Sequence, residues 1–493
     1  MNSNLAPTGI DGLDDILRGG LPRGRIYLIR GEPGTGKTTL ALQFLRQGAK
    51  DGERGLYFAQ SESVDEIEGT AASHDWDLSG IDIFSLDSAQ QLVSRENQNS
   101  VFRTATVELT ETESLLYQRI KASSPDRVVI DSMSEFRLLA AEPWVYRLQL
   151  LRLKTFFASQ GVTALLLDSS EGFASEPENL VHGVISLTYE ISDFGHSRRK
   201  LSVRKMRQTA FMEGNHDIDI RSDGLWVFPR LIAAEMGHSA TLSPVLPSGV
   251  KGLDELVGGG LDAGSTILII GPAGVGKSTI SMQFGIHAAE QGMKVQAFVF
   301  EEREDIMLQR WASLGYDLRP HLERKTISMR HLDPAELSAG EFARQVRIAV
   351  EEEGAKLLII DSLTGYQQAM SDERTLMLQL HELQTYLGNH GVTTIIVDTQ
   401  HGVFTASSAA APNISYLADT VLLLRYYEFR GAIRKAVSAL KRRAGRHETT
   451  IRDYEMGPTG LTVGRALTEF SGVLSGSPVY LSTDSPFRDG KQP

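Results

Sequence analysis

The chain carries one phosphate-binding pattern twice, and both copies hold residues that could do chemistry on a nucleotide. The pattern G-x-x-x-x-G-K-[ST] begins at Gly31 and again at Gly271. Its glycines let the backbone turn so that several N–H groups point at phosphate oxygens. The lysine reaches the β- and γ-phosphates, and the following hydroxyl ligates Mg²⁺. We therefore expect ATP to bind at two sets of residues: Gly31, Gly34, Thr35, Gly36, Lys37, Thr38 and Thr39, and Gly271, Gly274, Val275, Gly276, Lys277, Ser278 and Thr279.

The sequence around both loops supports this interpretation. Each loop follows an apolar run, Arg25–Ile29 or Thr266–Ile270, and each precedes a helical pattern. Strand, loop and helix in this order are the context that confirms the motif. A glycine-rich turn with an unrelated lysine would not recur in two equivalent contexts.

A second apolar run follows each loop and ends in aspartate. Arg127–Ser132 and Lys356–Ser362 both finish with Asp-Ser. At the carboxyl end of a parallel strand, such a carboxylate holds Mg²⁺ through water. We therefore expect the metal to be served by two pairs of residues: Thr38 with Asp131, and Ser278 with Asp361.

Length and pattern predict an α/β protein of two tandem P-loop NTPase domains. The chain has 493 residues, too many for one ordinary core. Near-continuous apolar strands alternate with amphipathic helices, which is typical of a mainly parallel twisted sheet flanked by helices. We predict domains at residues 1–235 and 236–474, followed by a mobile tail at 475–493 that is rich in Ser, Pro and Asp.

Composition argues against several other classes of protein. The net charge of -12 gives no basic field that would favour nucleic acid or an anionic membrane. The absence of cysteine excludes disulfides and thiol catalysis and suits a reducing cytoplasm. No signal-peptide pattern is present, and no apolar run approaches the ~20 residues of a membrane span. We expect a soluble cytoplasmic protein with no membrane partner and no nucleic-acid partner.

Further motifs make a family resemblance specific. Pro7–Asp14 reads P-T-G-I-D-G-L-D, Pro247–Asp254 reads P-S-G-V-K-G-L-D, and Gly-Gly-Leu follows each. Phe300-Glu301-Glu302 precedes a helical pattern, and a basic strand comes late in each half. In these features and in its ending at Tyr454–Pro478, the chain resembles the KaiC family of RecA-like ATPases over nearly its whole length.

The resemblance implies an assembly and an activity. Members of that family are homohexamers of two stacked rings, with ATP between neighbouring subunits. The N-terminal ring hydrolyses ATP slowly, and the C-terminal ring phosphorylates and dephosphorylates itself. For this chain the resemblance implies two RecA-like domains, ATP and Mg²⁺ as cofactors, and self-association, and it leaves room for regulatory protein partners.

Adjacent carboxylates supply the predicted catalytic residues of the second half. Phosphoryl transfer needs a base near the γ-phosphate, and a second carboxylate beside that base shifts its pKa. Glu301 and Glu302 fit these roles after a predicted strand. An acidic helix N-terminus is the alternative, but Glu304 and Asp305 fit that position better.

The first half departs from this pattern. Aligning Gly55–Gln60 with the second half puts Ser61 and Glu62 where two glutamates are expected, so the first carboxylate is missing. Two interpretations follow. Glu62 serves as the catalytic carboxylate alone, or this half binds ATP structurally and turns it over very slowly.

Basic strands occupy matching places at Lys200–Arg207 and Lys435–Arg443. Residues two apart on a strand share a face, so two pairs should project together: Lys205 with Arg207, and Lys441 with Arg443. In the resembled family these positions reach the neighbour's γ-phosphate in trans, as an arginine finger does. A solvated basic edge is one alternative. A nucleic-acid surface is another, which the acidic charge and the lack of interleaved aromatic residues disfavour.

The resemblance also points to a phosphoacceptor. Family members carry adjacent Ser and Thr hydroxyls across the subunit boundary from the C-terminal ATP. In Asn413–Thr420, Ser415 matches the Ser position and Tyr416 stands in the Thr position. The tyrosine hydroxyl lies farther from the backbone, which disfavours a two-step Ser/Thr cycle. Ser415 is the predicted acceptor, and an ordinary helix or turn hydroxyl is the alternative.

The sequence therefore predicts a hexameric ATPase with Ser/Thr autokinase activity in its second half, acting in signalling or clock-like regulation. An ATP-assembled signalling scaffold with little catalysis is the alternative, which the loss of the carboxylate at Ser61 favours for the first half. A DNA motor of the RecA, RadA or DnaB type is a weaker alternative, since no DNA-binding loop is recognisable.

Overall fold

The computed structural model describes residues 4–86, 105–140, 142–169, 176–191, 195–233, 245–368, 373–399, 416–473 and 479–480. The chain divides into two compact units, Met1–Arg230 and Leu231–Pro493. The domain boundary predicted between residues 235 and 236 lies in a stretch outside the described residues, so its position stays a prediction.

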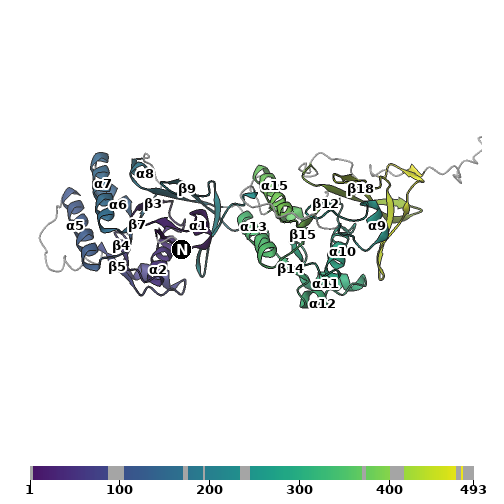
Figure 1. Ribbon diagram of the computed structural model, residues 1–493, viewed down its shortest axis with the longest axis horizontal. Helices are drawn as coiled ribbons and strands as arrows, with labels where there is room; N and C mark the ends of the chain where they lie inside the picture. The colour runs from purple at the N-terminus through teal and green to yellow at the C-terminus, as the bar shows by residue number, and fades with distance from the viewer. Residues whose placement is uncertain are drawn as a thin grey trace, which may run out of the picture. The chain divides into compact units, whose positions relative to one another are not determined.

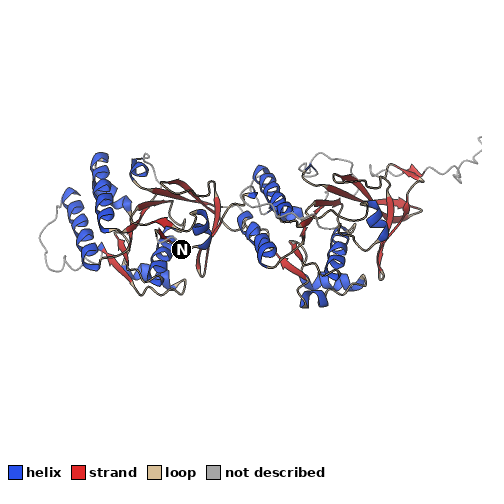
Figure 2. Ribbon diagram, viewed as in Figure 1, coloured by secondary structure: helices blue, strands red, loops and turns tan. Residues whose placement is uncertain are grey.

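The first unit alternates strands and helices in the way that the sequence predicts (Figures 1 and 2). Its elements are β1 Leu5–Ala6, α1 Asp11–Ile16, β2 Leu21–Pro22, β3 Ile26–Arg30, α2 Lys37–Lys50, β4 Gly55–Ala59, α3 Val64–Ala72, β5 Ile81–Ser85, α5 Ala105–Ser123, β6 Arg127–Asp131, α6 Met133–Ala140, α7 Pro143–Gln160, β7 Thr163–Asp168, α8 Glu176–Leu180, β8 Gly183–Glu190, β9 Arg198–Met206, β10 His216–Arg221 and β11 Gly224–Phe228.

The second unit repeats the same alternation of strands and helices. Its elements are α9 Lys251–Leu256, β12 Thr266–Gly271, α10 Lys277–Glu290, β13 Val295–Val299, α11 Glu304–Ser313, α12 Arg319–Glu323, β14 Ile327–His331, α13 Ala339–Arg347, the π-helix η2 Ile348–Glu352, β15 Leu357–Asp361, α14 Leu363–Gln368, α15 Glu373–Asn389, β16 Thr393–Thr399, β17 Thr420–Phe429, β18 Ala432–Arg442, β19 Arg452–Gly457, β20 Gly460–Ala466, β21 Phe470–Ser471 and β22 Val479–Tyr480.

Each unit is built on a nine-stranded mixed sheet. The first has the order β11-β10-β9-β8-β3-β7-β6-β4-β5, and the second has β14-β13-β15-β16-β12-β17-β18-β19-β20. Read from opposite ends, the two orders are the same. From β5 to β8 and from β14 to β17 neighbouring strands are parallel, and the remaining strands pair antiparallel. The prediction of two tandem, mainly parallel sheets flanked by helices is confirmed.

Apolar side chains on both faces of the parallel strands explain why helices cover both sides. On β3, Ile26 and Leu28 pack into one buried cluster with residues of α5, α6 and α7. Tyr27 and Ile29 pack into the opposite cluster with residues of α1 and α2. Figure 1 shows α5, α6 and α7 on one side of this sheet and α2 on the other. Helices on both faces leave the carboxyl ends of the strands for the connecting loops, where ligands bind in such sheets.

Part of the predicted C-terminal tail is described. Val479–Tyr480 forms β22, which pairs antiparallel with Phe470–Ser471 of β21. The other residues of the predicted tail lie outside the described residues, and their mobility stays a prediction. Among the helices that the structure describes, none is both long and apolar enough to cross a membrane.

Candidate nucleotide-binding sites

Both phosphate loops join the carboxyl end of a central strand to a helix. Gly36 is the N-cap residue of α2 with φ 97°, and Gly276 is the N-cap residue of α10 with φ 109°. A Cβ at Gly276 would lie 1.8 Å from the Met456 methyl carbon, and one at Gly36 would lie 2.9 Å from Ile220. Only glycine suits this conformation and this spacing. The backbone N–H groups that begin each helix therefore stay available for an anion.

Besides the loop lysine Lys277, four of the predicted ATP-binding residues have buried side chains: Thr35, Thr39, Val275 and Thr279. The Thr35 hydroxyl donates to the Glu32 carbonyl at 2.7 Å, and this hydrogen bond within the loop stabilises its turn. These residues face the core of their unit. Any contact that they make with a phosphate would come from the backbone N–H and not from the side chain.

The two loop lysines have closely similar surroundings. The Lys37 ammonium donates to the carbonyls of Gly31 at 2.7 Å and Glu32 at 3.0 Å. The Lys277 ammonium donates to the Pro272 carbonyl at 2.9 Å. Burial lowers the pKa of both lysines, and the carboxylates at the strand ends, Asp131 and Asp361 first, oppose that shift. Each cation is therefore held over its loop and near the aspartate predicted for the metal.

Asp131 of the first unit is the acceptor for two hydroxyls. Thr38 donates to its Oδ2 at 3.4 Å, and Tyr57 of β4 donates to the same oxygen at 2.5 Å. Burial raises the pKa of Asp131, while the bond from Tyr57 and the charge of Lys37 lower it. Sequence analysis did not single out Tyr57, although it stands four residues before Ser61.

Asp361 of the second unit is hydrogen-bonded to Ser278, the other residue of its predicted metal pair. Burial raises the pKa of Asp361, and the Ser278 hydroxyl and the charge of Arg310 lower it. Strand register fixes the correspondence of the two units. Ala59 pairs with Asp131, and Val299 pairs with Asp361.

These donors fit a magnesium ion that binds together with a nucleotide. A hydroxyl and one carboxylate provide hard oxygen ligands, and Mg²⁺ commonly takes its other ligands from water and substrate phosphates. Across the described residues, no group of three or more His, Cys, Asp or Glu side chains is placed to hold a metal by itself. The residues therefore suit Mg·ATP better than a metal bound by protein alone.

The two predicted catalytic carboxylates of the second unit contact different partners. Glu301 is exposed and accepts a hydrogen bond from the Ser362 hydroxyl at 2.7 Å. Glu302 forms an ion pair with Arg310 of α11 at 2.7 Å. The charge of Glu301 reaches Lys277. Glu301 is thus the carboxylate that is open toward the loop, and Glu302 is neutralised from the side. Helix α11 begins at Glu304, as expected from the acidic residues there.

The first unit has different groups at the same places. Ser61 is exposed, and Glu62 is half-buried before the N-cap Ser63 of α3. Burial raises the pKa of Glu62, and the charges of Asp131 and Glu66 add to the rise. Thr70 of α3 stands where α11 has Arg310. Glu62 is therefore more easily protonated than an ordinary glutamate.

The two predicted finger pairs are held in similar ways. Lys205 donates to the Glu178 carbonyl at 2.5 Å, and Arg207 donates to the Asn179 carbonyl at 2.9 Å. Lys441 donates to the Ala418 carbonyl at 2.7 Å, and Arg443 forms an ion pair with Asp419 at 3.3 Å. A β-bulge lies beside each lysine, in β8–β9 and in β17–β18. In each unit the two cations thus turn toward the same short segment, just before β8 or β17.

The finger clusters differ at one position. His182 of the first unit matches Asp419 of the second, because each directly precedes the strand that pairs with the loop strand. Burial lowers the pKa of His182 to about 4, and four cations add to the shift: Lys154, Arg25, Arg207 and Lys205. Asp419 instead pairs with Arg443. The first cluster therefore carries more positive charge.

A hairpin residue also braces each loop. Arg199 donates to the Gly34 carbonyl at 3.1 Å in the first unit. The Tyr426 hydroxyl donates to the Ala273 carbonyl at 3.2 Å in the second. The first loop is thus held by a cation and the second by a neutral phenol.

The predicted phosphoacceptor Ser415 lies outside the described residues, so its role stays a prediction. The next residue, Tyr416, is 53% exposed, and its carbonyl accepts a hydrogen bond from Arg443 of the finger pair. The segment that leads from the predicted acceptor into β17 therefore touches the basic cluster.

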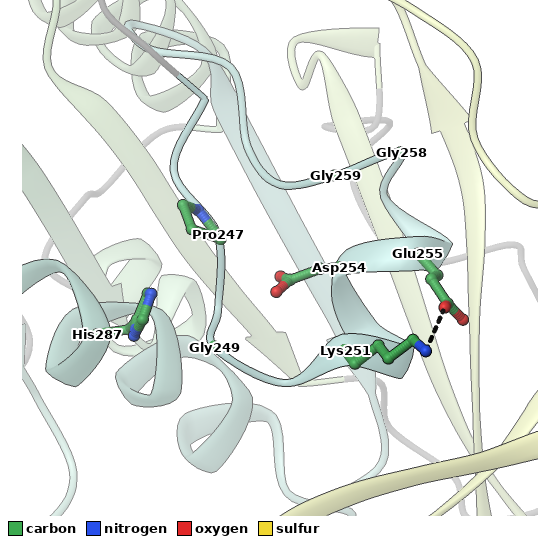
Figure 3. Close-up of a pocket in the computed structure, with 8 residues that line it drawn as sticks. All are labelled: Pro247, Gly249, Lys251, Asp254, Glu255, Gly258, Gly259 and His287. Carbon is green, nitrogen blue, oxygen red and sulfur yellow. Dashed lines mark ion pairs between the residues drawn. The ribbon is translucent and has the colours of Figure 1, made fainter.

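The two P-[ST]-G segments have a structural role. Thr8 donates to Asp14 from its N–H and its hydroxyl, both at 2.8 Å, and Ser248 donates to Asp254 at 2.6 and 2.7 Å. In the second unit this turn lines a pocket with His287 of α10 (Figure 3). The described residues that line that pocket include none of the predicted nucleotide-binding residues. The segment thus fixes a turn beside the helix of the phosphate loop.

Two P-loops, each between a central strand and a helix with an aspartate on a nearby parallel strand, define a protein with two RecA-like ATPase domains. The model of the family described as "ATPase: KaiC" matches residues 6–232 and 246–468. The chain belongs to the KaiC ATPase family, as the motifs indicated.

Curated relatives cover almost the whole chain. The chain is 28% identical to the "Circadian clock oscillator protein KaiC" of Picosynechococcus sp., over 97% of this chain and 93% of that protein. It is 26% identical to the "Circadian clock oscillator protein KaiC 1" of Synechocystis sp., over 97% and 92%. With the KaiC of Prochlorococcus marinus it shares 27% identity over 98% and 97%.

Proposed function

We propose that the protein is a KaiC-like ATPase that binds Mg·ATP in both halves and transfers phosphoryl groups mainly in its C-terminal half. The observation that carries the proposal is the contrast at matching strand ends. Both halves have a loop lysine, a hydroxyl and an aspartate in contact range. Only the second half adds an exposed glutamate, Glu301, at the end of its strand.

The residues have separate roles in the proposed site. Lys37 and Lys277 would neutralise the β- and γ-phosphates. Thr38 with Asp131, and Ser278 with Asp361, would hold Mg²⁺, which would neutralise further phosphate charge. Glu301 accepts a proton from the attacking hydroxyl, and Ser362 keeps its carboxylate oriented. Glu302, paired with Arg310, adds little negative charge that would repel the phosphates.

We further propose autophosphorylation at Ser415. The Ser415 hydroxyl oxygen attacks the γ-phosphorus of ATP on the neighbouring subunit, and its proton passes to Glu301. The bond from the γ-phosphorus to the bridging oxygen breaks, and ADP leaves. Tyr416, which follows Ser415, contacts Arg443 through its carbonyl, which supports a place for this segment beside the finger pair.

The proposed assembly is a homohexamer of two stacked rings in which the finger pairs act on the neighbour's nucleotide. Support comes from the family membership and from the finger pairs, which occupy the same place in both halves. Because nucleotide would join neighbouring subunits, ATP should promote assembly. The curated relatives are named as clock oscillator proteins, and we propose a regulatory role in the cytoplasm for this protein, with partners of its own.

The test is to incubate the purified protein with Mg·ATP and to map phosphate by mass spectrometry, while light scattering follows its mass. We expect a shift from monomer to hexamer and phosphate on Ser415. The Lys277→Ala variant is the control, because it should assemble less well and carry no phosphate. A persistent monomer at saturating nucleotide would contradict the ring. Phosphate on Tyr416 alone, or nowhere, would move the proposal toward an ATP-assembled scaffold.

A further inference from the structure

Tyr57 brings a second hydroxyl to the aspartate of the N-terminal site. Its side chain is fully buried on β4, and its hydroxyl donates to Asp131 Oδ2 at 2.5 Å. The Thr38 hydroxyl donates to the same oxygen at 3.4 Å. The oxygen that faces the predicted metal ligand Thr38 is therefore also the oxygen that binds the phenol.

The C-terminal site differs at this place. Tyr57 pairs across the sheet with Val129, two residues before Asp131, and Ala297 pairs with Ile359, two residues before Asp361. Ala297 thus occupies the place of Tyr57, and it has no hydroxyl to donate. Asp361 keeps its hydrogen bond from Ser278, the counterpart of Thr38.

The extra bond changes what the carboxylate can offer to a cation. Each carboxylate oxygen has roughly two lone-pair sites. Oδ2 of Asp131 accepts from Thr38 and from Tyr57, so both sites on that oxygen are in use. A donor to a carboxylate also draws charge away from it. A metal ion, or water bound to it, that approaches Oδ2 would have to share this oxygen or displace a hydroxyl.

We propose that Tyr57 is a positioning residue that competes with Mg²⁺ for Asp131 and weakens metal binding at the N-terminal site relative to the C-terminal one. The inference rests on the proposed function, since it assumes that Mg·ATP binds between the loop of Lys37 and Asp131. The N-terminal nucleotide site therefore binds its metal ion less tightly than the C-terminal site does. Because Mg²⁺ neutralises the charge that develops on the transferring phosphoryl group, weaker metal binding adds to the missing carboxylate at Ser61 in slowing turnover.

The experiment measures metal affinity directly. Mn²⁺ replaces Mg²⁺ and is followed by electron paramagnetic resonance, with a non-hydrolysable ATP analogue present. The parent protein carries Lys277→Ala, which removes the C-terminal site from the titration. Tyr57→Phe deletes one oxygen atom and keeps the ring in the core. We expect its Mn²⁺ affinity to rise about fivefold over the parent, the factor that corresponds to one net hydrogen bond. An unchanged or weaker affinity would overturn the inference.

Tyr27→Phe is the matched control. Tyr27 is equally buried on β3 of the same unit, but its hydroxyl donates to the Pro22 carbonyl at 2.7 Å. Its Mn²⁺ affinity should equal that of the parent, and thermal unfolding should show that both variants are folded. An equal rise in both variants would overturn the inference. A parent protein that binds no analogue would instead refute the proposed N-terminal site, a result distinct from a parent that binds and does not respond to Tyr57→Phe.

Discussion

The two halves of this protein share a frame and differ in the few side chains that meet at the strand ends. The order of their sheets is the same, and the phosphate loops, the aspartates and the finger pairs occupy corresponding places. Ser61 replaces Glu301, and Tyr57 replaces Ala297. The fold thus determines where a nucleotide could bind. We propose that single substitutions on β4 and just after it decide whether the site is suited to turning that nucleotide over.

The halves also differ in how their cores are held. Arg127 begins β6 and is fully buried, with bonds to Glu53 at 2.5 Å and to the carbonyls of Pro7 and Phe44. The matching residue on β15 is Leu357, which is equally buried. A charged group thus ties the first segment of the chain to the N-terminal sheet, whereas the C-terminal sheet uses ordinary apolar packing.

The largest expected effect separates the two candidate bases. Glu301→Gln should reduce phosphoryl transfer by about 10²–10⁴-fold, the range for loss of a general base. Glu62→Gln should reduce total turnover much less, because the first half lacks the carboxylate that Glu301 provides in the second, and because burial and nearby carboxylates raise the pKa of the half-buried Glu62. Steady-state ATP hydrolysis of both variants, with nucleotide binding verified, measures the ratio. Equal losses of ATP hydrolysis in the two variants would contradict the proposed difference between the halves.

A second comparison concerns stability. Arg127→Leu, which installs the residue of the other half, should destabilise the N-terminal unit by about 3 kcal/mol, because Glu53 and the backbone carbonyls lose a buried cation. Hydrogen exchange read by mass spectrometry should show faster exchange in peptides of Met1–Arg230. Peptides of the C-terminal unit should keep their exchange rates. Leu357→Val, a mild change at the matching residue of the C-terminal unit, is the control and should leave the N-terminal peptides unchanged. Slower exchange in the N-terminal unit would contradict this prediction, because it would mean that apolar packing stabilises the unit more than the buried Arg127 does.

A smaller effect is expected when the missing carboxylate is restored. Ser61 is exposed, as Glu301 is, so the larger side chain fits without burial. In protein that also carries Lys277→Ala, Ser61→Glu should raise N-terminal ATP turnover about tenfold. This gain is less than the about 10²–10⁴-fold that a well-positioned base contributes, because Tyr57 still binds Asp131. Ser61→Gln has the same size without the charge and is the control. Unchanged turnover would show that another residue, with Tyr57 the first candidate, limits the rate.

The smallest effect is a dependence of stability on pH. The folded pKa of His182 is about 4 and its ordinary value is 6.5. The unfolded chain therefore binds more protons between those values, and stability falls as the pH falls through that window. His182→Gln should flatten this part of the pH profile of the N-terminal unit, while leaving stability above pH 6.5 nearly unchanged. Urea unfolding at several pH values measures it, and added salt should weaken the effect. A steeper profile in the variant would contradict this sign.

Much of the fold and part of the site could be predicted from sequence. Apolar runs gave the strands that carry Asp131 and Asp361, and the loop pattern gave both lysines and both hydroxyls. These features depend on local residue order. The missed residues, Tyr57 and Arg310, act across strands and helices, so no local pattern marks them. Comparing the two halves position by position would have exposed Tyr57 against Ala297, although not the oxygen that it contacts.

The most direct test of unequal halves is to determine which nucleotide each site contains after turnover. The protein would be incubated with Mg·ATP, transferred rapidly into nucleotide-free buffer, aged and examined by electron cryomicroscopy. We predict ATP with an intact γ-phosphate beside Lys37 and ADP beside Lys277. ADP in the N-terminal sites together with intact ATP in the C-terminal sites would contradict the proposed division between binding and turnover.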